Sequence, residues 1–309
     1  MTHGYHTPAL RDEVLHYLQT TPDGIYIDGT LGGGGHTESI VKTLSSRGRV
    51  VAFDKDEDAI HFAENRLEDF RDRIIIVHDN FSHMKSQIIR LGLGNVDGIL
   101  LDLGVSSFQV DEASRGFSFQ RESKLDMRMD QNQKLDAWTV INSYEQGELA
   151  DVFWKYGEER HSRRIARAIV GERNRTPIET TRDLSTIVER VVGGKAPQKS
   201  LARIFQAIRI EVNRELDSLG EGLRSAVDLL RPGGRLVVIA YHSLEDRIIK
   251  DFFKEESRTT LPSGTKYLPD QPVQPRLRLL TRKPVTASQE EVAGNSRARS
   301  AKLRAAERV

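Results

Sequence analysis

Four short runs of apolar, mostly β-branched residues each end on an acidic residue. These runs are residues 25–28, 50–54, 74–79 and 99–102. Continuous apolar runs of this length are typical of parallel strands that are buried on both faces of a sheet. In an open α/β sheet the ligand crevice lies beyond the carboxyl ends of the strands. We therefore expect the four acids to gather at one rim, around a ligand that carries positive charge.

A glycine-rich segment, residues 28–36, follows the first strand and leads into a helical pattern. Glycines at a strand-to-helix turn permit positive φ and a close approach of the backbone to a ligand. The spacing differs from the G-x-G-x-x-G loop that holds the pyrophosphate of a dinucleotide, and Asp28 would lie against those phosphates. S-adenosylmethionine has no phosphate and carries two cationic groups, so the acidic rim favours it over NAD.

The remaining rim acids fit this interpretation to different degrees. Asp54, after the second strand, suits ribose hydroxyls in either a methyl-donor or a dinucleotide site. Asp79 and Asp102 are expected to line the adenine and methionine ends. Each acid alone could instead cap the helix that follows its strand, an explanation that accounts less well for four acids and the glycine turn together.

A long gap separates the fourth strand from the fifth, which is predicted at residues 235–241. A crossover connection needs about a dozen residues plus its loops, far less than this gap. Short amphipathic helices without a strand pattern occur near residues 147–156, 162–174, 183–192 and from 201 onward. We therefore predict a small helical domain at 108–211, inserted into a discontinuous domain of residues 1–107 and 212–309.

The predicted fold class is α/β, with a Rossmann-like sheet and an inserted helical domain. Beyond the fifth strand the pattern predicts a helix over 244–254. A last strand is predicted at 277–281, and a terminal helix near 296–308.

Composition narrows the chemistry. The 309 residues include no cysteine, which excludes disulfides, thiolate metal sites and a cysteine nucleophile. Methylation of carbon 5 of a pyrimidine normally needs such a nucleophile. We therefore expect an acceptor with its own lone pair, such as an amine. The histidines lack metal-ligand spacing, so no metal is expected, and the absence of signal or membrane segments predicts a cytoplasmic enzyme.

Charge is unevenly distributed although the net charge is only +1. Four arginines at i, i+3, i+4 and i+7 form one predicted helix stripe: Arg160, Arg163, Arg164 and Arg167. Residues 276–309 hold nine basic residues against three acidic ones. Arginines suit phosphate, which favours a nucleic-acid partner over a merely solvated helix face. Phe117 and Phe119 could stack on an unpaired base or pack in the core of the insert.

Motifs from nearly the whole chain resemble one known family. They are HTPAL at 6–10, DGTLGGGGH at 28–36, LDLGVSS at 101–107, RGFSF at 115–119, LDMRMD at 125–130, YGEER at 156–160, SRRIARAI at 162–169, FQAIRIEVN at 205–213, PGGRL at 232–236, HSLEDRI at 242–248 and RARSAKLR at 297–304. The chain thus resembles the bacterial small-subunit ribosomal RNA (cytosine-N4)-methyltransferases, the MraW or RsmH family. The resemblance implies S-adenosyl-L-methionine as cofactor and N4-methylation of a cytidine in the decoding region.

The resemblance also implies a set of site residues. The cofactor positions carry over to Gly34, Gly35, His36, Asp54, Phe81, Asp102 and Gln109. Asp102 is also the candidate catalytic residue, because its carboxylate can accept hydrogens from the reacting amine. Phe108, which stands between Ser107 and Gln109, leaves the shape of the pocket wall open.

Other residues are candidates for contacts with RNA or protons. Arg128 in the LDMRMD segment, Arg163 and Arg164 are expected to hold ribosomal RNA, either bare or within the small subunit. The target base is expected to leave its stack. His242 could relay a proton, although a histidine just past a strand is more often a hydrogen-bonded structural group.

Three alternatives remain open. A dinucleotide-dependent oxidoreductase would share the fold, and a non-catalytic RNA-binding factor could keep a vestigial pocket. A DNA amine methyltransferase usually shows a D/N/S-P-P-Y/F motif after the fourth strand, where this chain has Asp102-Leu103-Gly104-Val105. The sequence also leaves the oligomeric state open, with a homodimer among the options.

Overall fold

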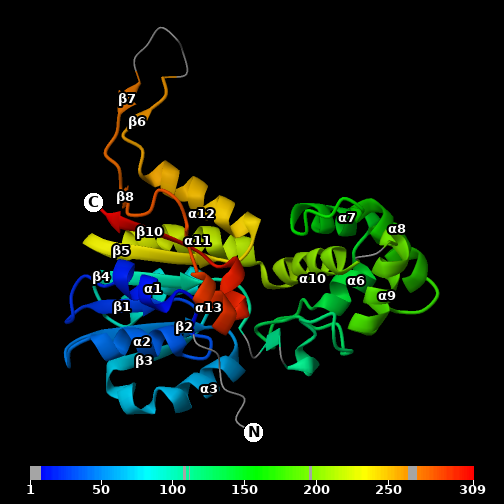
Figure 1. Ribbon diagram of the computed structural model, residues 1–309, viewed down its shortest axis with the longest axis horizontal. Coiled ribbons are helices and arrows are strands. Elements are labelled where there is room, and N and C mark those ends of the chain that lie inside the picture. The colour runs from blue at the N-terminus through cyan, green and yellow to red at the C-terminus, as the bar shows by residue number, and fades with distance from the viewer. Residues whose placement is uncertain (1–7, 107–108, 111, 195–196, 264–269) are drawn as a thin grey trace. The chain divides into compact units, whose positions relative to one another are not determined.

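The computed structural model describes residues 8–106, 109–110, 112–194, 197–263 and 270–309 (Figure 1). The motif residues at 6–7 and 107–108 lie outside the described residues. The chain forms two compact units, Met1–Gly104 with Asp217–Val309, and Val105–Leu216. We call the second unit the insert; it reaches a few residues beyond 108–211 at both ends.

The first unit is built on an eight-stranded sheet of order β3-β2-β1-β4-β5-β10-β8, with β9 paired to β10. Its strands are β1 Ile25–Asp28, β2 Arg49–Asp54, β3 Ile74–His78, β4 Val96–Asp102, β5 Leu230–Ala240, β8 Leu277–Leu279, β9 Val285–Thr286 and β10 Lys302–Arg308. Strands β1 to β5 run parallel to one another, whereas β10 is antiparallel to β5 and β8. The mostly parallel sheet confirms the predicted α/β class. The carboxyl ends of β1 to β4 therefore lie at one edge.

Alternate residues of the central strands enter two separate cores, as the pleat of a strand requires. In β1, for example, Tyr26 packs in one cluster and Ile27 in the other. The first cluster takes residues from α1, α2 and α3, and the second takes residues from α4, α11 and α12. These helices span α1 Arg11–Leu18, α2 Gly35–Thr43, α3 Glu57–Arg66, α4 Met84–Arg90, α11 Glu215–Leu229 and α12 Ser243–Glu256. Burial on both faces explains why these strands appear in the sequence as unbroken apolar runs.

The predicted terminal helix at 296–308 is wrong. A short 3₁₀ helix, Ser296–Ser300, is followed by strand β10, which pairs with β5 and places Leu303 opposite Ile239. Ala305 of β10 packs in the first cluster and Ala306 in the second. Pairing between two strands with burial on both faces overrides the helix propensity of a segment rich in alanine, arginine and lysine.

Shorter elements complete the first unit. They are the helix α13 Gln289–Gly294, the 3₁₀ turns Glu68–Arg73 and Phe81–His83, and the strands β6 Thr260–Leu261 and β7 Gln271–Pro272. The β6–β7 pair extends away from the sheet (Figure 1). Across the described parts of the chain, no helix combines the length and the apolar character that a bilayer crossing requires.

Among its described residues, the insert packs five helices around a core of its own. They are α6 Ala137–Ser143, α7 Gln146–Lys155, α8 Ser162–Arg173, α9 Thr181–Val192 and α10 Gln198–Asn213, and a 3₁₀ turn covers Ala113–Arg115. Four of the helices match the predicted ones, whereas α6 was not predicted. One isolated bridge, Lys124 to Thr180, is the only strand-like pairing among the described residues of the insert.

Candidate cofactor and substrate sites

The glycine-rich segment forms a tight turn between β1 and α2. Gly34 has φ of 77° immediately before the helix, a conformation that side chains other than glycine rarely adopt. A Cβ at Gly34 would also lie 3.2 Å from a methyl carbon of Leu67. The turn is tied to the neighbouring strands, because Gly29 N donates to Leu100 O and Leu31 N to Phe53 O, both at 2.8 Å. The sequence therefore builds this turn at the carboxyl edge of the sheet.

Two of the four strand-terminal acids already accept hydrogen bonds from neighbouring residues of the chain. Asp28 is fully buried and accepts hydrogen bonds from Thr37 Oγ1 at 2.7 Å and Thr30 N at 3.1 Å, and burial raises its pKa. Asp79 accepts from His83 Nδ1 at 2.8 Å and from Gln87 Nε2 at 2.6 Å. Although burial opposes its ionisation, these bonds hold the pKa of Asp79 below its ordinary value. Neither acid caps the helix that follows its strand, because the N-cap of α2 is Gly34 and that of the 3₁₀ turn Phe81–His83 is Asn80. The capping alternative is therefore wrong for both acids, and their contact with a ligand stays a prediction.

Asp54 at the end of β2 keeps its carboxylate at the rim. Its Oδ2 accepts from Gly32 N at 2.7 Å, and its Oδ1 accepts from Asp56 N at 2.9 Å. Each oxygen retains a lone pair for a further donor. Burial raises the pKa of Asp54 to about 6, which the two backbone hydrogen bonds only partly offset.

Asp102 at the end of β4 is surrounded by polar side chains from neighbouring elements. Its Oδ1 accepts a 2.8 Å hydrogen bond from Tyr241 Oη, and its Oδ2 lies 3.5 Å from Nε2 of His36. Its backbone N donates to Thr30 Oγ1 at 2.7 Å. His36 is buried, and neither of its ring nitrogens has a hydrogen-bond partner among the described residues. Tyr241 is not among the predicted site residues, because a strand pattern does not tell which side chain reaches the end of the neighbouring strand.

The other predicted cofactor residues fall into different parts of the chain. Gly35 begins α2, and half-buried Phe81 packs against the second cluster close to Gly29, whose added Cβ would lie 3.1 Å from that of Phe81. Gln109 belongs to the insert, where its Oε1 accepts from Ser106 N at 3.0 Å. Six of the seven predicted cofactor residues therefore lie in the first unit.

The contacts of His242 fit the structural alternative to a proton relay. It caps α12, where its Nδ1 accepts from Glu245 N at 3.4 Å. Its Nε2 lies 3.2 Å from Oε1 of Glu245. The same glutamate accepts from Tyr241 N at 2.9 Å, so this cap also fixes the backbone just beyond β5.

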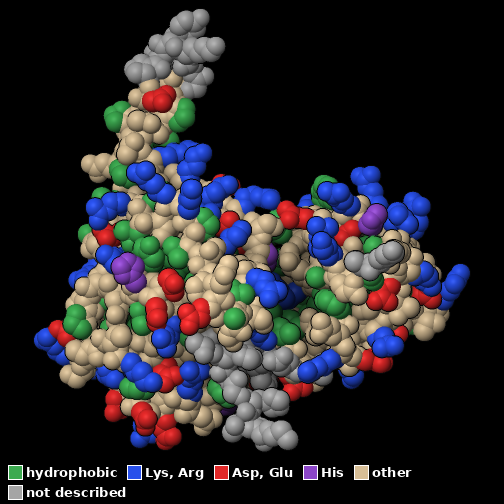
Figure 2. Space-filling view, viewed as in Figure 1, with side chains coloured by type: hydrophobic (Ala, Val, Ile, Leu, Met, Phe, Trp, Pro, Cys, Tyr) green, Lys and Arg blue, Asp and Glu red, His purple; other side chains and the backbone are tan. Residues whose placement is uncertain are grey.

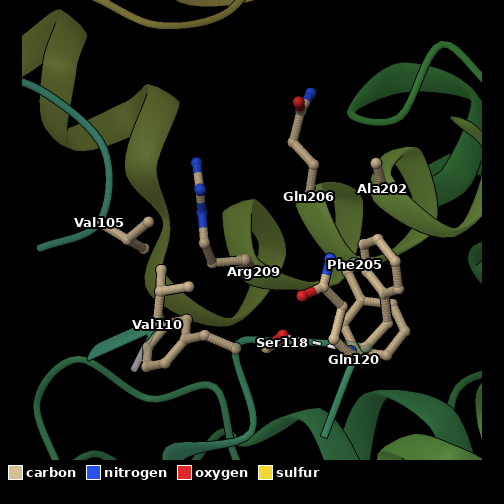
Figure 3. Close-up of a pocket in the computed structure, with 10 residues that line it drawn as sticks. Val105, Val110, Ser118, Gln120, Ala202, Phe205, Gln206 and Arg209 are labelled. Atoms are coloured by element: carbon tan, nitrogen blue, oxygen red, sulfur yellow. Dashed lines mark hydrogen bonds between the residues drawn. The ribbon is translucent and has the colours of Figure 1, made fainter. Parts of the chain in front are cut away.

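The insert contains a pocket of about 320 Å³ (Figure 3). It is lined by Val105, Val110, Phe117, Ser118, Phe119, Gln120, Ala202, Phe205, Gln206 and Arg209. Phe119 meets Phe205 edge to face at 5.6 Å, and both Phe117 and Phe119 are half-buried against the core of the insert. The two rings therefore pack against the core of the insert and also line a pocket, so both roles predicted for them fit the structure.

The predicted RNA-contact arginines differ in their surroundings. Arg128 is bound to Asp126 by two hydrogen bonds, at 2.7 and 3.0 Å, and also donates to the Gln131 and Gln133 carbonyls. These bonds hold Arg128 within its own loop, and its contact with RNA stays a prediction. Arg163 and Arg164 are exposed on α8, and Arg164 donates to Val191 O at 2.9 Å.

The arginine stripe is shorter than predicted. Arg160 precedes α8 in a turn, two residues after Glu158, whose φ is 49°. Arg163, Arg164 and Arg167 are exposed on the helix and leave the Ile165 side buried. Figure 2 shows Lys and Arg side chains spread over the end of the insert that carries α7 and α8. In the C-terminal segment, by contrast, Arg276, Arg278 and Arg304 are paired with acids, which weakens its case as a basic surface.

A parallel sheet with a glycine turn, and with carboxylates at the ends of β2 and β4, is typical of Rossmann-like folds that bind a nucleoside cofactor. A family model for the MraW methylase family matches residues 3–309, and the chain belongs to this family.

Named relatives match over almost their full length. The chain is 48% identical over 306 residues to the ribosomal RNA small subunit methyltransferase H of Carboxydothermus hydrogenoformans, covering 98% of each. It is 46% identical over 316 residues to the protein of the same name from Lactobacillus delbrueckii subsp. bulgaricus, covering 98% of this chain and 99% of that one. A solved rRNA methylase from Streptococcus thermophilus has a TM-score of 0.41 at 13% identity, covering 97% of this chain and 93% of that one, a likeness too low to carry an argument.

Proposed function

We propose that this protein uses S-adenosyl-L-methionine to methylate N4 of a cytidine in the decoding region of small-subunit ribosomal RNA. The observation that carries the proposal is the Asp102 carboxylate, which stands beside the glycine turn and His36 in a member of the MraW methylase family. The names of the relatives support ribosomal RNA as the class of substrate.

The rim suits a ligand with a ribose and a cationic centre. Each oxygen of Asp54 can accept one more hydrogen bond, which fits the two ribose hydroxyls. The ring nitrogens of buried His36 lack a partner among the described residues, so a polar group of a ligand can bind to them. When bound, the cofactor supplies the methyl group as an electrophile on its sulfonium. The carboxylate of Asp102 places negative charge on the same side of the sheet.

The acceptor must be oriented, because the lone pair of an exocyclic amine is delocalised into its ring. Asp102 can accept a hydrogen of this amine, which favours a tetrahedral nitrogen and points the lone pair along the line of transfer. Transfer would form the new bond from the nitrogen lone pair to the methyl carbon and would leave the electron pair of the carbon–sulfur bond on sulfur. The proton lost from nitrogen passes to Asp102 and from there to water. Positioning and electrostatics thus provide the catalysis.

Substitution of Asp102 tests this assignment. Asp102→Ala should abolish methyl transfer from labelled cofactor to small subunits that lack the modification, and Asp102→Asn, which keeps the shape of the side chain, should lower it steeply. Asp69→Asn, which removes an exposed acid from the first unit, is the control and should leave transfer unchanged. Turnover of Asp102→Ala within a few-fold of the parent would contradict the proposed role. Mass mapping of the product RNA identifies the methylated nucleotide.

The insert is the proposed RNA-recognition unit, with the exposed arginines of α8 as phosphate contacts and the Phe117–Phe119 pocket as a surface for an unpaired base. The double reversal Arg163→Glu/Arg164→Glu should weaken RNA binding and lower the slope of log affinity against log salt by about 2. Arg182→Glu, an exposed reversal in the first turn of α9, is the matched control in the same unit. An unchanged slope in the double variant would remove these arginines from the interface.

Calorimetry separates the alternatives to this function. A methyltransferase binds S-adenosylhomocysteine and not NAD, whereas a dinucleotide-dependent oxidoreductase shows the reverse. A non-catalytic RNA-binding factor would bind ribosomal RNA but transfer no label from the cofactor.

A further inference from the structure

We propose that Tyr241 is a positioning residue for the reaction: its phenol fixes the Asp102 carboxylate so that Oδ2 is presented to the acceptor amine. This inference rests on the proposed function and adds a residue outside the predicted site. Its basis is the 2.8 Å hydrogen bond from Tyr241 Oη to Asp102 Oδ1, which joins the ends of two neighbouring parallel strands.

The ring of Tyr241 is held from several sides. Tyr241 directly follows β5, and its backbone N donates to Glu245 in the cap of α12. Its ring packs against the first core cluster and against Gly104, where an added Cβ would lie 3.4 Å from the Cδ2 atom of the ring. Gly104 has φ of 98°, so the backbone beside the ring takes a path that glycine permits. The phenol oxygen therefore has little freedom to move.

The hydrogen bond determines how the carboxylate of Asp102 is turned. The backbone of Asp102 is fixed by β4 and by its hydrogen bond to Thr30 Oγ1. With the backbone held, rotation of the side chain is the remaining freedom, and the phenol selects the rotamer in which Oδ1 faces Tyr241. Oδ2 then lies on the side of His36 and stays available to a second donor. Burial, and next the charge of Asp102, raise the pKa of Tyr241, so the phenol remains a donor at working pH.

The test compares two removals of a phenol hydroxyl from the same unit. Tyr241→Phe keeps the ring against Gly104 and removes only the donor to Asp102. Tyr26→Phe is the matched control: its hydroxyl donates to Thr21 O at 2.7 Å before β1, at the opposite end of that strand from the rim. Both rings pack with the first core cluster.

Tyr241→Phe should lower kcat for methyl transfer about 10- to 100-fold, with KM and S-adenosylhomocysteine affinity within about twofold of the parent. Tyr26→Phe should leave kcat unchanged. In an Asp102→Asn background with measurable residual transfer, Tyr241→Phe should cause a much smaller further loss, because the two residues act through one carboxylate. The proposal is overturned by an unchanged kcat in Tyr241→Phe, by an equal loss in Tyr26→Phe, or by a parallel loss of cofactor affinity. A parent protein that transfers no methyl group to cytidine would refute the proposed function itself, and the parent assay shows this separately.

Discussion

Gly222 of α11 lies against the ring of Phe81, and a Cβ added at Gly222 would come within 2.5 Å of the Cδ2 atom of that ring. Phe81 is a proposed cofactor residue, whereas Gly222 itself is buried in the helix. The glycine thus keeps space for an aromatic side chain at the carboxyl edge of the sheet.

Gly222→Ala should displace Phe81 and lower the affinity for S-adenosylhomocysteine about tenfold in a calorimetric titration. Gly220→Ala on the same helix is the control, because the nearest atoms to its new Cβ would be the flexible end of Arg224 at 3.7 Å. Both substitutions raise helix propensity by about 1 kcal/mol, so that effect cancels in the comparison. Equal affinities for the two variants would place Phe81 outside the cofactor site.

The raised pKa of Asp54 predicts a pH dependence of cofactor binding. With a pKa of about 6, most Asp54 carboxyls are protonated at pH 5 and ionised at pH 7. Ribose hydroxyls donate best to the ionised form, so affinity for S-adenosylhomocysteine should rise by about tenfold over this interval. Asp54→Asn should bind more weakly and lose most of the slope. A slope that persists in Asp54→Asn would assign it to another group, such as Asp28, whose pKa is also raised by burial.

The raised pKa of Asp54 affects folding stability in the opposite direction: in the ligand-free protein, a rise in pH lowers the stability, whereas it raises the affinity for the ligand. The folded-state pKa of Asp54 lies above the ordinary value of 3.8, so folding favours the neutral carboxyl. Its stabilising contribution is complete below about pH 4 and is lost as the pH rises through about 6. Hydrogen bonds from a bound ribose would restore part of this stability. The gain in Tm on adding S-adenosylhomocysteine should therefore be larger at pH 7 than at pH 5.

Asn213 holds the LDMRMD segment in the insert. Its Oδ1 accepts from Met129 N at 2.8 Å, and its Nδ2 donates to Met127 O at 2.7 Å. Asn213 is buried, so Asn213→Ala leaves these backbone groups without partners and should destabilise the insert by about 2–4 kcal/mol.

Tryptophan fluorescence can measure the stability of the insert separately from that of the first unit. Both tryptophans of the chain, Trp138 and Trp154, lie in the insert, so their emission during urea unfolding reports on this unit. Asn174→Ala, an exposed asparagine at the end of α8, should change the midpoint little. Similar midpoints for both variants would show that the Asn213 bonds contribute little net stability.

The sequence predicts those parts of the fold that depend on local pattern. Strands β1 to β5 are recognisable because burial on both faces demands unbroken apolar runs. Strand β10 is not, because its short apolar part, Leu303 with Ala305 and Ala306, lies among charged residues, and its pairing partner is far away in the sequence. Whether a helix or a strand forms there is decided by tertiary pairing.

In the site, too, local sequence pattern predicts some features, whereas others depend on tertiary contacts. The sequence shows acidic residues at the strand ends, which predicts that Asp54 and Asp102 lie at the rim. It does not show which of the acids already accept hydrogen bonds from other residues of the chain. The buried hydrogen bonds of Asp28 to Thr30 and Thr37, and the reach of Tyr241 to Asp102, depend on side-chain directions across neighbouring strands. Likewise, helical spacing cannot show that the turn at Glu158 leaves Arg160 outside α8.

The ion pair between Arg304 of β10 and Asp246 of α12 should stabilise the misassigned C-terminal strand. Arg304 is 8% exposed, and its Nε lies 2.7 Å from Oδ1 of Asp246, whose pKa is lowered because the bonds from Arg304 and Lys302 outweigh the effect of burial. Arg304→Ala leaves a half-buried carboxylate with only a 3.6 Å contact to Lys302, and should cost about 2–3 kcal/mol in denaturant unfolding followed by circular dichroism. Arg278→Ala removes the exposed pair with Glu307 and should cost less than about 1 kcal/mol.

The lowered pKa of Asp246 also predicts how this loss depends on pH. Because the lowered pKa favours the ionised acid in the folded state, the stabilisation from Asp246 is present above about pH 4 and disappears as the pH falls through the folded-state pKa. The difference in stability between the parent and Arg304→Ala should therefore shrink in acid. A difference that stays constant down to pH 3 would instead assign the loss to the packing of the arginine side chain.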